Sequence, residues 1–188
     1  MDKNQEDDSQ GPVTASKKTS VVTFRIDDSY NRALRDEAEE SRISVNTLAN
    51  HILGDYLEWK RYMDKFGHIT LTRETYKMMI NLISEKDLIK LAIEIAQKRP
   101  REFIMFKWKE VNLENVVSFI RMFCYSNGFG KYDYIKNKNN HTFSIRHDFG
   151  KKGSVYLKTF FETLIQSILD KPCQSSITDN GITMSFHD

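Results

Sequence analysis

A short alternation of apolar and polar residues over positions 21–27 is the most distinctive pattern in the chain. One face consists of Val22, Phe24 and Ile26, and the other consists of Val21, Thr23 and Arg25. A period of two residues is that of a β-strand with one covered face. The pattern therefore predicts a strand whose apolar face joins a core and whose other face points outward.

Two helical patterns follow this strand without a long connection. Asp27, Asp28 and Ser29 offer N-cap chemistry for a first amphipathic helix, which the turn at Ser41 should end. Ser44 is placed to cap a second helix with a wide apolar stripe, so this helix should be largely buried. The stripe comprises Val45, Leu48, Ala49, Ile52, Leu53, Tyr56 and Leu57. The helix is expected to continue to Phe66 and to end at Gly67, a residue suited to a helix C-terminus.

Strand, helix, turn and helix in this order resemble the ribbon-helix-helix family of transcriptional repressors, the MetJ/Arc type. The residues that carry the resemblance are 23–28, at the junction of strand and first helix, and 38–46, around the turn between the helices. Many members have a glycine in that turn, whereas this chain has Ser41, Arg42 and Ile43. The resemblance implies an intertwined homodimer in which two strands form one antiparallel ribbon in the DNA major groove.

The resemblance also implies which residues touch double-stranded DNA. The outward face of the ribbon would contact bases through Val21, Thr23 and Arg25, and a guanidinium suits the O6 and N7 of guanine. Phosphates would be bound by basic residues and by the start of the second helix, where amides and the helix dipole favour an anion. These phosphate contacts are Lys17, Lys18, Arg42, Ser44, Val45 and Asn46.

The flanking segments complete a three-part organisation. Residues 1–20 are polar without apolar periodicity and predict a disordered tail, residues 21–67 form the ribbon-helix-helix domain, and residues 68–188 form a second domain. In that domain we expect a helix capped by Thr70 or Thr72, a helix ending by Pro100, and a strand over 102–108. A helix over 113–125, a hairpin with strands 132–136 and 141–146, a helix over 154–169 and a hairpin around 179–181 should follow. This order favours an α+β fold with helices on one face of an antiparallel sheet.

Three features of the second domain suggest ligands, each with an ordinary structural alternative. Gly150, Lys151, Lys152, Gly153 and Ser154 are a candidate anion or ligand loop at a helix N-terminus, although they lack the Walker spacing. His141 and His147 share the core parity of the second strand, which favours structural histidines. Basic and aromatic residues alternate as in single-stranded nucleic-acid binders, but a half-buried hairpin has the same composition. They are Tyr132, Tyr134, Lys136, Lys138 and Phe143.

Charge, cysteines and motif content narrow the function classes. The net charge is +2, with +5 from Ile69 onward and −3 before it, so DNA affinity would depend on local placement of basic residues. The spacing of His, Cys and carboxylates predicts no metal site, and no cofactor motif or catalytic arrangement is distinctive, so we do not expect an enzyme. Cys124 and Cys173 suggest reduced thiols, with a redox pair as the less favoured alternative. No segment predicts a membrane span or signal peptide, which indicates a cytoplasmic protein.

These patterns favour a sequence-specific DNA-binding transcriptional regulator that acts as a homodimer. The second domain would sense a small-molecule or protein effector, stabilise the oligomer or recruit a partner. The sequence leaves open whether two dimers form a tetramer on adjacent DNA half-sites. Two alternatives compete: an antitoxin-type interaction module, and a nucleic-acid-processing protein that uses the ribbon only for docking.

Overall fold

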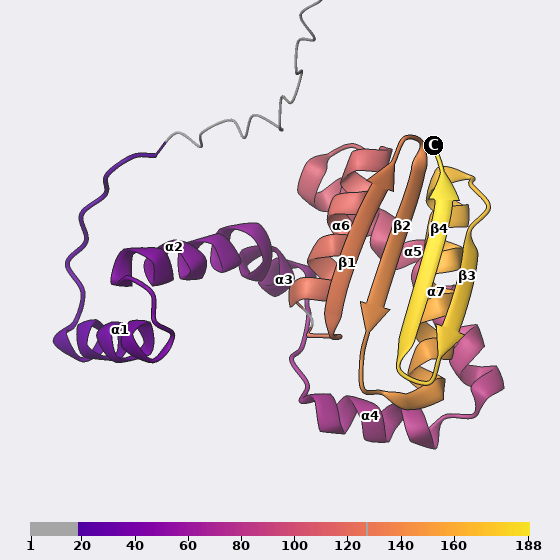
Figure 1. Ribbon diagram of the computed structural model, residues 1–188, viewed down its shortest axis with the longest axis horizontal. Coiled ribbons are helices and arrows are strands. Elements are labelled where there is room, and N and C mark those ends of the chain that lie inside the picture. The colour runs from indigo at the N-terminus through magenta and orange to yellow at the C-terminus, as the bar shows by residue number, and fades with distance from the viewer. Residues whose placement is uncertain (1–18, 127) are drawn as a thin grey trace, which may run out of the picture. The chain divides into compact units, whose positions relative to one another are not determined.

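The computed structural model describes residues 19–126 and 128–188, and this part of the chain divides into two compact units. The first ends at Ala49 and the second spans Asn50–Asp188. The fold is α+β, mostly helical with one four-stranded antiparallel sheet packed against helices (Figure 1). Lys17 and Lys18 lie outside the described residues.

The first unit contains helix α1, Asp28–Glu40, and the start of helix α2, Val45–Asp55. Both expected helices are confirmed, and Ser44 caps α2 because its hydroxyl accepts a hydrogen bond from the Thr47 amide at 3.0 Å. Asp27 precedes α1 but makes no side-chain cap, whereas Asp28 pairs with Arg32 at 2.6 Å.

The turn between α1 and α2 closes with a left-handed residue at Arg42, whose φ is 54°. The Ile43 amide donates to the Ala38 carbonyl and the Arg42 amide donates to the Glu39 carbonyl, at 2.9 and 3.0 Å. These two bonds define a Schellman motif, in which the left-handed position is usually glycine. The chain therefore keeps the turn geometry typical of a glycine with an arginine in its place.

Residues 19–27 have no regular secondary structure in the single chain, so the expected strand over 21–27 is not observed. A strand is defined by ladder hydrogen bonds to a second strand, and none of the described residues supplies one to this segment. The sequence alternation is a property of one chain, whereas ribbon pairing is a property of two.

The continuation of α2 belongs to the second unit. A π-helical segment, η1 at Tyr56–Lys60, leads into α3 at Arg61–Phe66, and Gly67 ends the helix with φ 75°. The expected end at Gly67 is thus confirmed. Met63 joins the core of the second unit, and Trp59 and Phe66 pack against it. The expected domain boundary after Gly67 therefore differs from the division at Ala49.

The sheet of the second unit has the strand order β1-β2-β4-β3, with every neighbouring pair antiparallel. Its strands are β1 at Lys131–Asn137, β2 at Asn140–Arg146, β3 at Gln174–Thr178 and β4 at Gly181–His187. Both expected hairpins are confirmed. Phe143 pairs with Met184, and Ile145 pairs with Ile182, all four on the buried face.

Helices cover one face of this sheet, as expected from the sequence (Figure 1). Helix α6 at Leu113–Ser126 contacts β1, and α7 at Gly150–Leu169 contacts β3 and β4. Helix α5 at Glu85–Trp108 packs against α6 and α7, and α4 at Arg73–Leu82 packs against α7. Thr72 caps α4, since its hydroxyl accepts from the Thr75 amide at 3.2 Å. No helix among the described residues is both long and apolar enough to cross a bilayer.

Two expectations around Pro100 were wrong. Helix α5 continues through Pro100, and residues 102–108 are its last turns instead of a strand. A proline inside a helix costs about 3 kcal/mol, but the buried face continues on both sides of it, through Ala96 before and Ile104 after. A short apolar run such as 103–106 does not by itself distinguish a strand from a buried helix.

Replacing Arg42 with glycine should stabilise the protein, because a side chain in the left-handed conformation costs about 1 kcal/mol that glycine avoids. Urea denaturation monitored through helix content measures the gain. Arg42→Ala loses the same charge but keeps the Cβ atom, so it should give no gain. Equal stabilisation by both variants would show that charge removal, not backbone geometry, is responsible.

Acidification should destabilise the second unit through His147. Its Nδ1 accepts from the Phe149 amide at 3.2 Å, its Nε2 lies 3.0 Å from the Ser154 hydroxyl, and burial lowers its pKa. A folded-state pKa below that of the unfolded chain leaves stability intact at neutral pH and removes it as pH falls below about 6.5. Melting temperatures across this range should fall less steeply for His147→Gln, and an unchanged slope would contradict the assignment.

Candidate nucleic-acid interface

The segment expected to form the ribbon is exposed along its whole length. Val21 is 98% exposed and Phe24 is 64% exposed, although Phe24 lies on the face expected to be covered. Thr23 and Arg25 are also exposed, and Arg25 forms no ion pair with another residue in the described ranges. The outward-facing polar groups are therefore accessible, and the described residues leave the opposite, apolar face uncovered as well.

The first unit buries very little apolar surface of its own. Among residues 19–49, Ala38 alone is buried, and Tyr30 on α1 is 64% exposed. Helix α2 has no buried residue, so the expectation that it is largely buried does not hold within one chain. Ile52 and Leu53 on α2 remain 49% and 43% exposed. Each element thus presents an apolar surface that the described residues of this unit leave uncovered.

The expected phosphate-binding elements are accessible at the start of α2. Arg42 and Ser44 are exposed, Val45 is half-buried, and Asn46 is exposed in the first turn. The Ser44 hydroxyl already accepts the Thr47 amide, which orders this turn. The positive end of the α2 dipole and the Arg42 guanidinium therefore lie next to each other in sequence and on the surface.

The candidate anion loop of the second domain proves to be the first turn of α7, so the expectation of a loop was wrong. Gly153 and Ser154 are buried, and the Lys152 ammonium donates to the Asn81 and Ile83 carbonyls at 2.9 and 2.6 Å. Lys152 therefore ties α7 to the end of α4. The Gly150 amide donates to the Asn180 side chain at 2.9 Å, and Lys151 remains exposed.

The interleaved basic and aromatic residues do not form an exposed stacking surface. The rings of Tyr132, Tyr134 and Phe143 pack together on the core face of the sheet, with Tyr134 and Phe143 stacked at 4.8 Å. Lys136 and Lys138 lie at the end of the hairpin and its turn. The pattern reflects a half-buried hairpin.

The two histidines of the second strand region lie on the core face, as parity predicted. His141 is 2% exposed, with the Tyr134 hydroxyl 2.7 Å from Nδ1 and the Asp188 carboxylate 2.6 Å from Nε2. His147 bonds to Ser154 instead. Every nitrogen of both rings has a protein partner, which fits structural roles.

The described residues contain neither a cluster of metal-binding side chains nor a pair of bonded cysteines. Their His, Cys, Asp and Glu side chains form no group able to hold a metal ion. Cys124 and Cys173 are both free, and burial raises the pKa of each thiol, to about 11 for Cys173. Neither thiol is therefore an activated thiolate at neutral pH.

The sequence patterns identified the polar residues of the exposed segment but not the size of its uncovered surface. The size of that surface depends on which apolar residues are buried by the rest of the fold, and periodicity does not show which residues these are. Comparison with protein-family models and with curated protein sequences found no match to this chain. The candidate interface therefore stands on its residues and their geometry.

Proposed function

We propose that this protein is a sequence-specific DNA-binding transcriptional regulator, whose N-terminal segment pairs with that of a second copy into a ribbon-helix-helix dimer. The observation that carries the proposal is the uncovered apolar surface of the first unit. Val22, Phe24 and Ile26 are all at least half exposed, directly before two amphipathic helices with one buried residue before Ala49.

A second copy is a suitable cover for this surface because the exposed segment has the alternation of a strand but no strand to pair with. Pairing two copies antiparallel would satisfy the backbone hydrogen bonds and bury both apolar faces against the helices. Burial of a phenylalanine such as Phe24 is worth about 2 kcal/mol, counted once for each copy. Dimerisation would thus provide the core that one chain lacks.

The opposite face of such a ribbon is suited to base recognition. Thr23 and Arg25 would stand side by side on both strands, and the ribbon width fits the major groove. The starts of both α2 helices, with Arg42 nearby, would hold phosphates on either side. The acidic balance of residues 1–68 means that this local arrangement, not net charge, would supply affinity.

The second unit suits a regulatory role better than a DNA-contacting one. It has its own core around Phe143, Phe161 and Ile165. The residues that suggested nucleic-acid binding in this unit instead form the first turn of α7 and the packed face of the β1–β2 hairpin. The helix that leaves the first unit enters this core through Met63. A ligand or partner of the second unit would therefore act on the same helix that the dimer uses.

Arg25→Ala should weaken specific binding by about 1–3 kcal/mol and relax the preference at one base pair, because the bidentate contact to guanine is lost. Selection from a random-sequence DNA library by the purified protein measures both effects. Arg25→Lys is the matched control, since it keeps the charge but not the planar fork, and it should retain salt-sensitive binding with reduced preference. An unchanged selected motif in Arg25→Ala would remove this residue from base recognition.

Charges placed on the two faces of the segment should have different effects. Phe24→Glu should abolish the dimer, because it buries an unpaired carboxylate in the shared core. Thr23→Glu should leave the dimer intact and abolish DNA binding, because its carboxylate would enter the major groove, where the surrounding phosphates repel a negative charge. Light scattering and DNA titration of both variants distinguish the outcomes. A dimeric Phe24→Glu protein that still binds DNA would contradict the proposed ribbon.

A further inference from the structure

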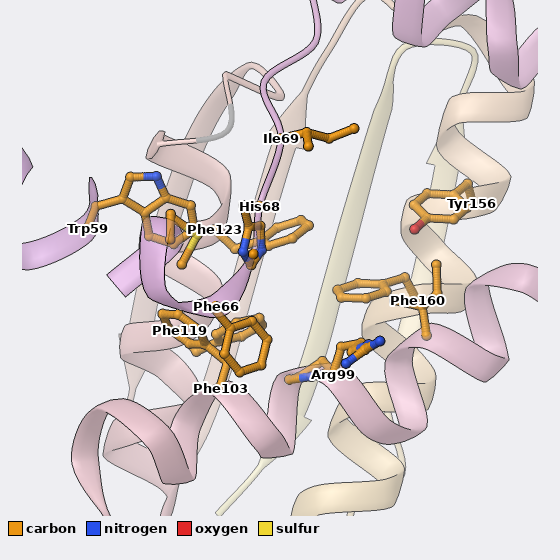
Figure 2. Close-up of a pocket in the computed structure, with 14 residues that line it drawn as sticks. Trp59, Phe66, His68, Ile69, Arg99, Phe103, Phe119, Phe123, Tyr156 and Phe160 are labelled. Atoms are coloured by element: carbon orange, nitrogen blue, oxygen red, sulfur yellow. The ribbon is translucent and has the colours of Figure 1, made fainter. Parts of the chain in front are cut away.

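A half-open cavity of about 380 Å³ lies inside the second unit, and the proposed function does not use it. Figure 2 shows its walls, which come from the α3 region, α5, α6 and α7. The size is within the range of small-molecule sites in proteins. Six large aromatic side chains supply most of the lining: Trp59, Phe66, Phe103, Phe119, Phe123 and Phe160.

The aromatic walls hold one another in place. The Phe103 ring contacts the rings of Phe66 and Phe119, with centroids 5.5 and 5.7 Å apart. On the α7 side, Phe123 and Phe160 stack at 5.2 Å. Such walls are fixed before a ligand arrives, and their flat faces favour stacking with another ring. The lining rings pack against one another but leave the space between them unfilled.

Polar groups are few in this cavity, and two of them are donors. Arg99 on α5 uses Nη1 for a 3.0 Å bond to Glu102, which leaves the other N–H groups of its guanidinium. The Tyr156 hydroxyl on α7 has no hydrogen bond to any residue in the described ranges, and Figure 2 shows Tyr156 and Arg99 on either side of Phe160. Burial raises the pKa of Tyr156 to about 12, so its hydroxyl is a donor at neutral pH.

The third polar group of the cavity is His68, and the pKa of its imidazole reflects the surroundings of the cavity. Burial lowers its pKa, the backbone bond with Met63 opposes this, and the positive charge of Arg99 lowers it further. His68 is therefore neutral at neutral pH. The cavity is therefore bordered by the Arg99 guanidinium, which also pairs with the Glu102 carboxylate, by the Tyr156 hydroxyl and by flat apolar walls.

We propose that this cavity binds a small aromatic carboxylic acid, with the ring between the phenylalanine walls and the carboxylate on Arg99. A planar guanidinium matches a carboxylate in a bidentate pair. The Tyr156 hydroxyl supplies a further donor for the ligand. A cavity of this volume holds about a dozen non-hydrogen atoms, given that a water molecule occupies about 30 Å³ of liquid. That is the size of a single ring with a short acidic side chain.

Trp59, Met63 and Phe66 form one wall of the cavity, and they lie on the helical segments that directly follow α2 in the sequence. An acid that contacts this wall would stabilise one conformation of these segments, and α2 is the helix that the proposed dimer uses. This regulatory consequence rests on the proposed function, whereas binding of the acid does not. DNA affinity should therefore differ between the empty and the occupied protein.

Calorimetric titration of the full-length protein with phenylacetate, 3-phenylpropionate and 1-naphthylacetate tests the site directly. Each acid has a neutral amide as its matched probe, and we expect the amides to bind at least about tenfold more weakly. Arg99→Gln should lose about tenfold in affinity for the acids and nothing for the amides. Arg101→Gln, two residues away on α5 and exposed, is the control and should bind as the unchanged protein does.

Three results would overturn the proposal: saturation by none of the acids, equal binding of acids and amides, or equal losses in Arg99→Gln and Arg101→Gln. Tyr156→Phe tests the second donor without removing the ring, and it should weaken acid binding less than Arg99→Gln. DNA titrations with and without phenylacetate are read separately. Acid binding through Arg99 in a protein that binds no DNA would contradict the proposed function and leave the cavity assignment standing.

Discussion

The described residues of the N-terminal unit leave an apolar surface open, and the proposed dimer depends on covering it. Two short helices with one buried alanine before Ala49 do not bury enough surface to offset the entropy of ordering them. The apolar residues that would supply the missing core are present, but they lie on the surface at Val22, Phe24 and Ile26. A partner chain that covers them would order the segment, fix which side chains face outward and set the spacing of the two α2 helices.

The second unit has the opposite character. Its sheet and the helices α5, α6 and α7 enclose a continuous aromatic and aliphatic core, and His141, His147 and Lys152 have internal hydrogen-bond partners. It supplies what the first unit lacks, because Trp59, Met63 and Phe66 anchor the end of the long second helix in that core. Its helices leave a cavity beside Arg99 and Tyr156. An ordered body with an aromatic cavity is suited to sensing, whereas a unit with little core of its own is suited to pairing.

Local signals predicted a large part of this fold. Ser44 as a cap, Gly67 as a helix end and the two hairpins all follow from residues within a few positions of each other. The prediction failed where tertiary packing decides, since the buried face of α5 carries the helix through Pro100 and into residues 102–108. The left-handed Arg42 was likewise hidden, because an arginine gives no sequence signal for that conformation. The cavity could not be predicted, because its residues come from four separate helices.

The central claim concerns hydrogen bonds that one chain does not contain. Amide hydrogen exchange of residues 21–27 in the full-length protein measures them directly, at concentrations above and below dimer dissociation. We predict protection of this segment when the protein is concentrated, and loss of protection on dilution, because the ladder of the proposed ribbon would join two chains. Fast exchange of the whole segment at every concentration, with DNA bound as well as without, would contradict the paired ribbon.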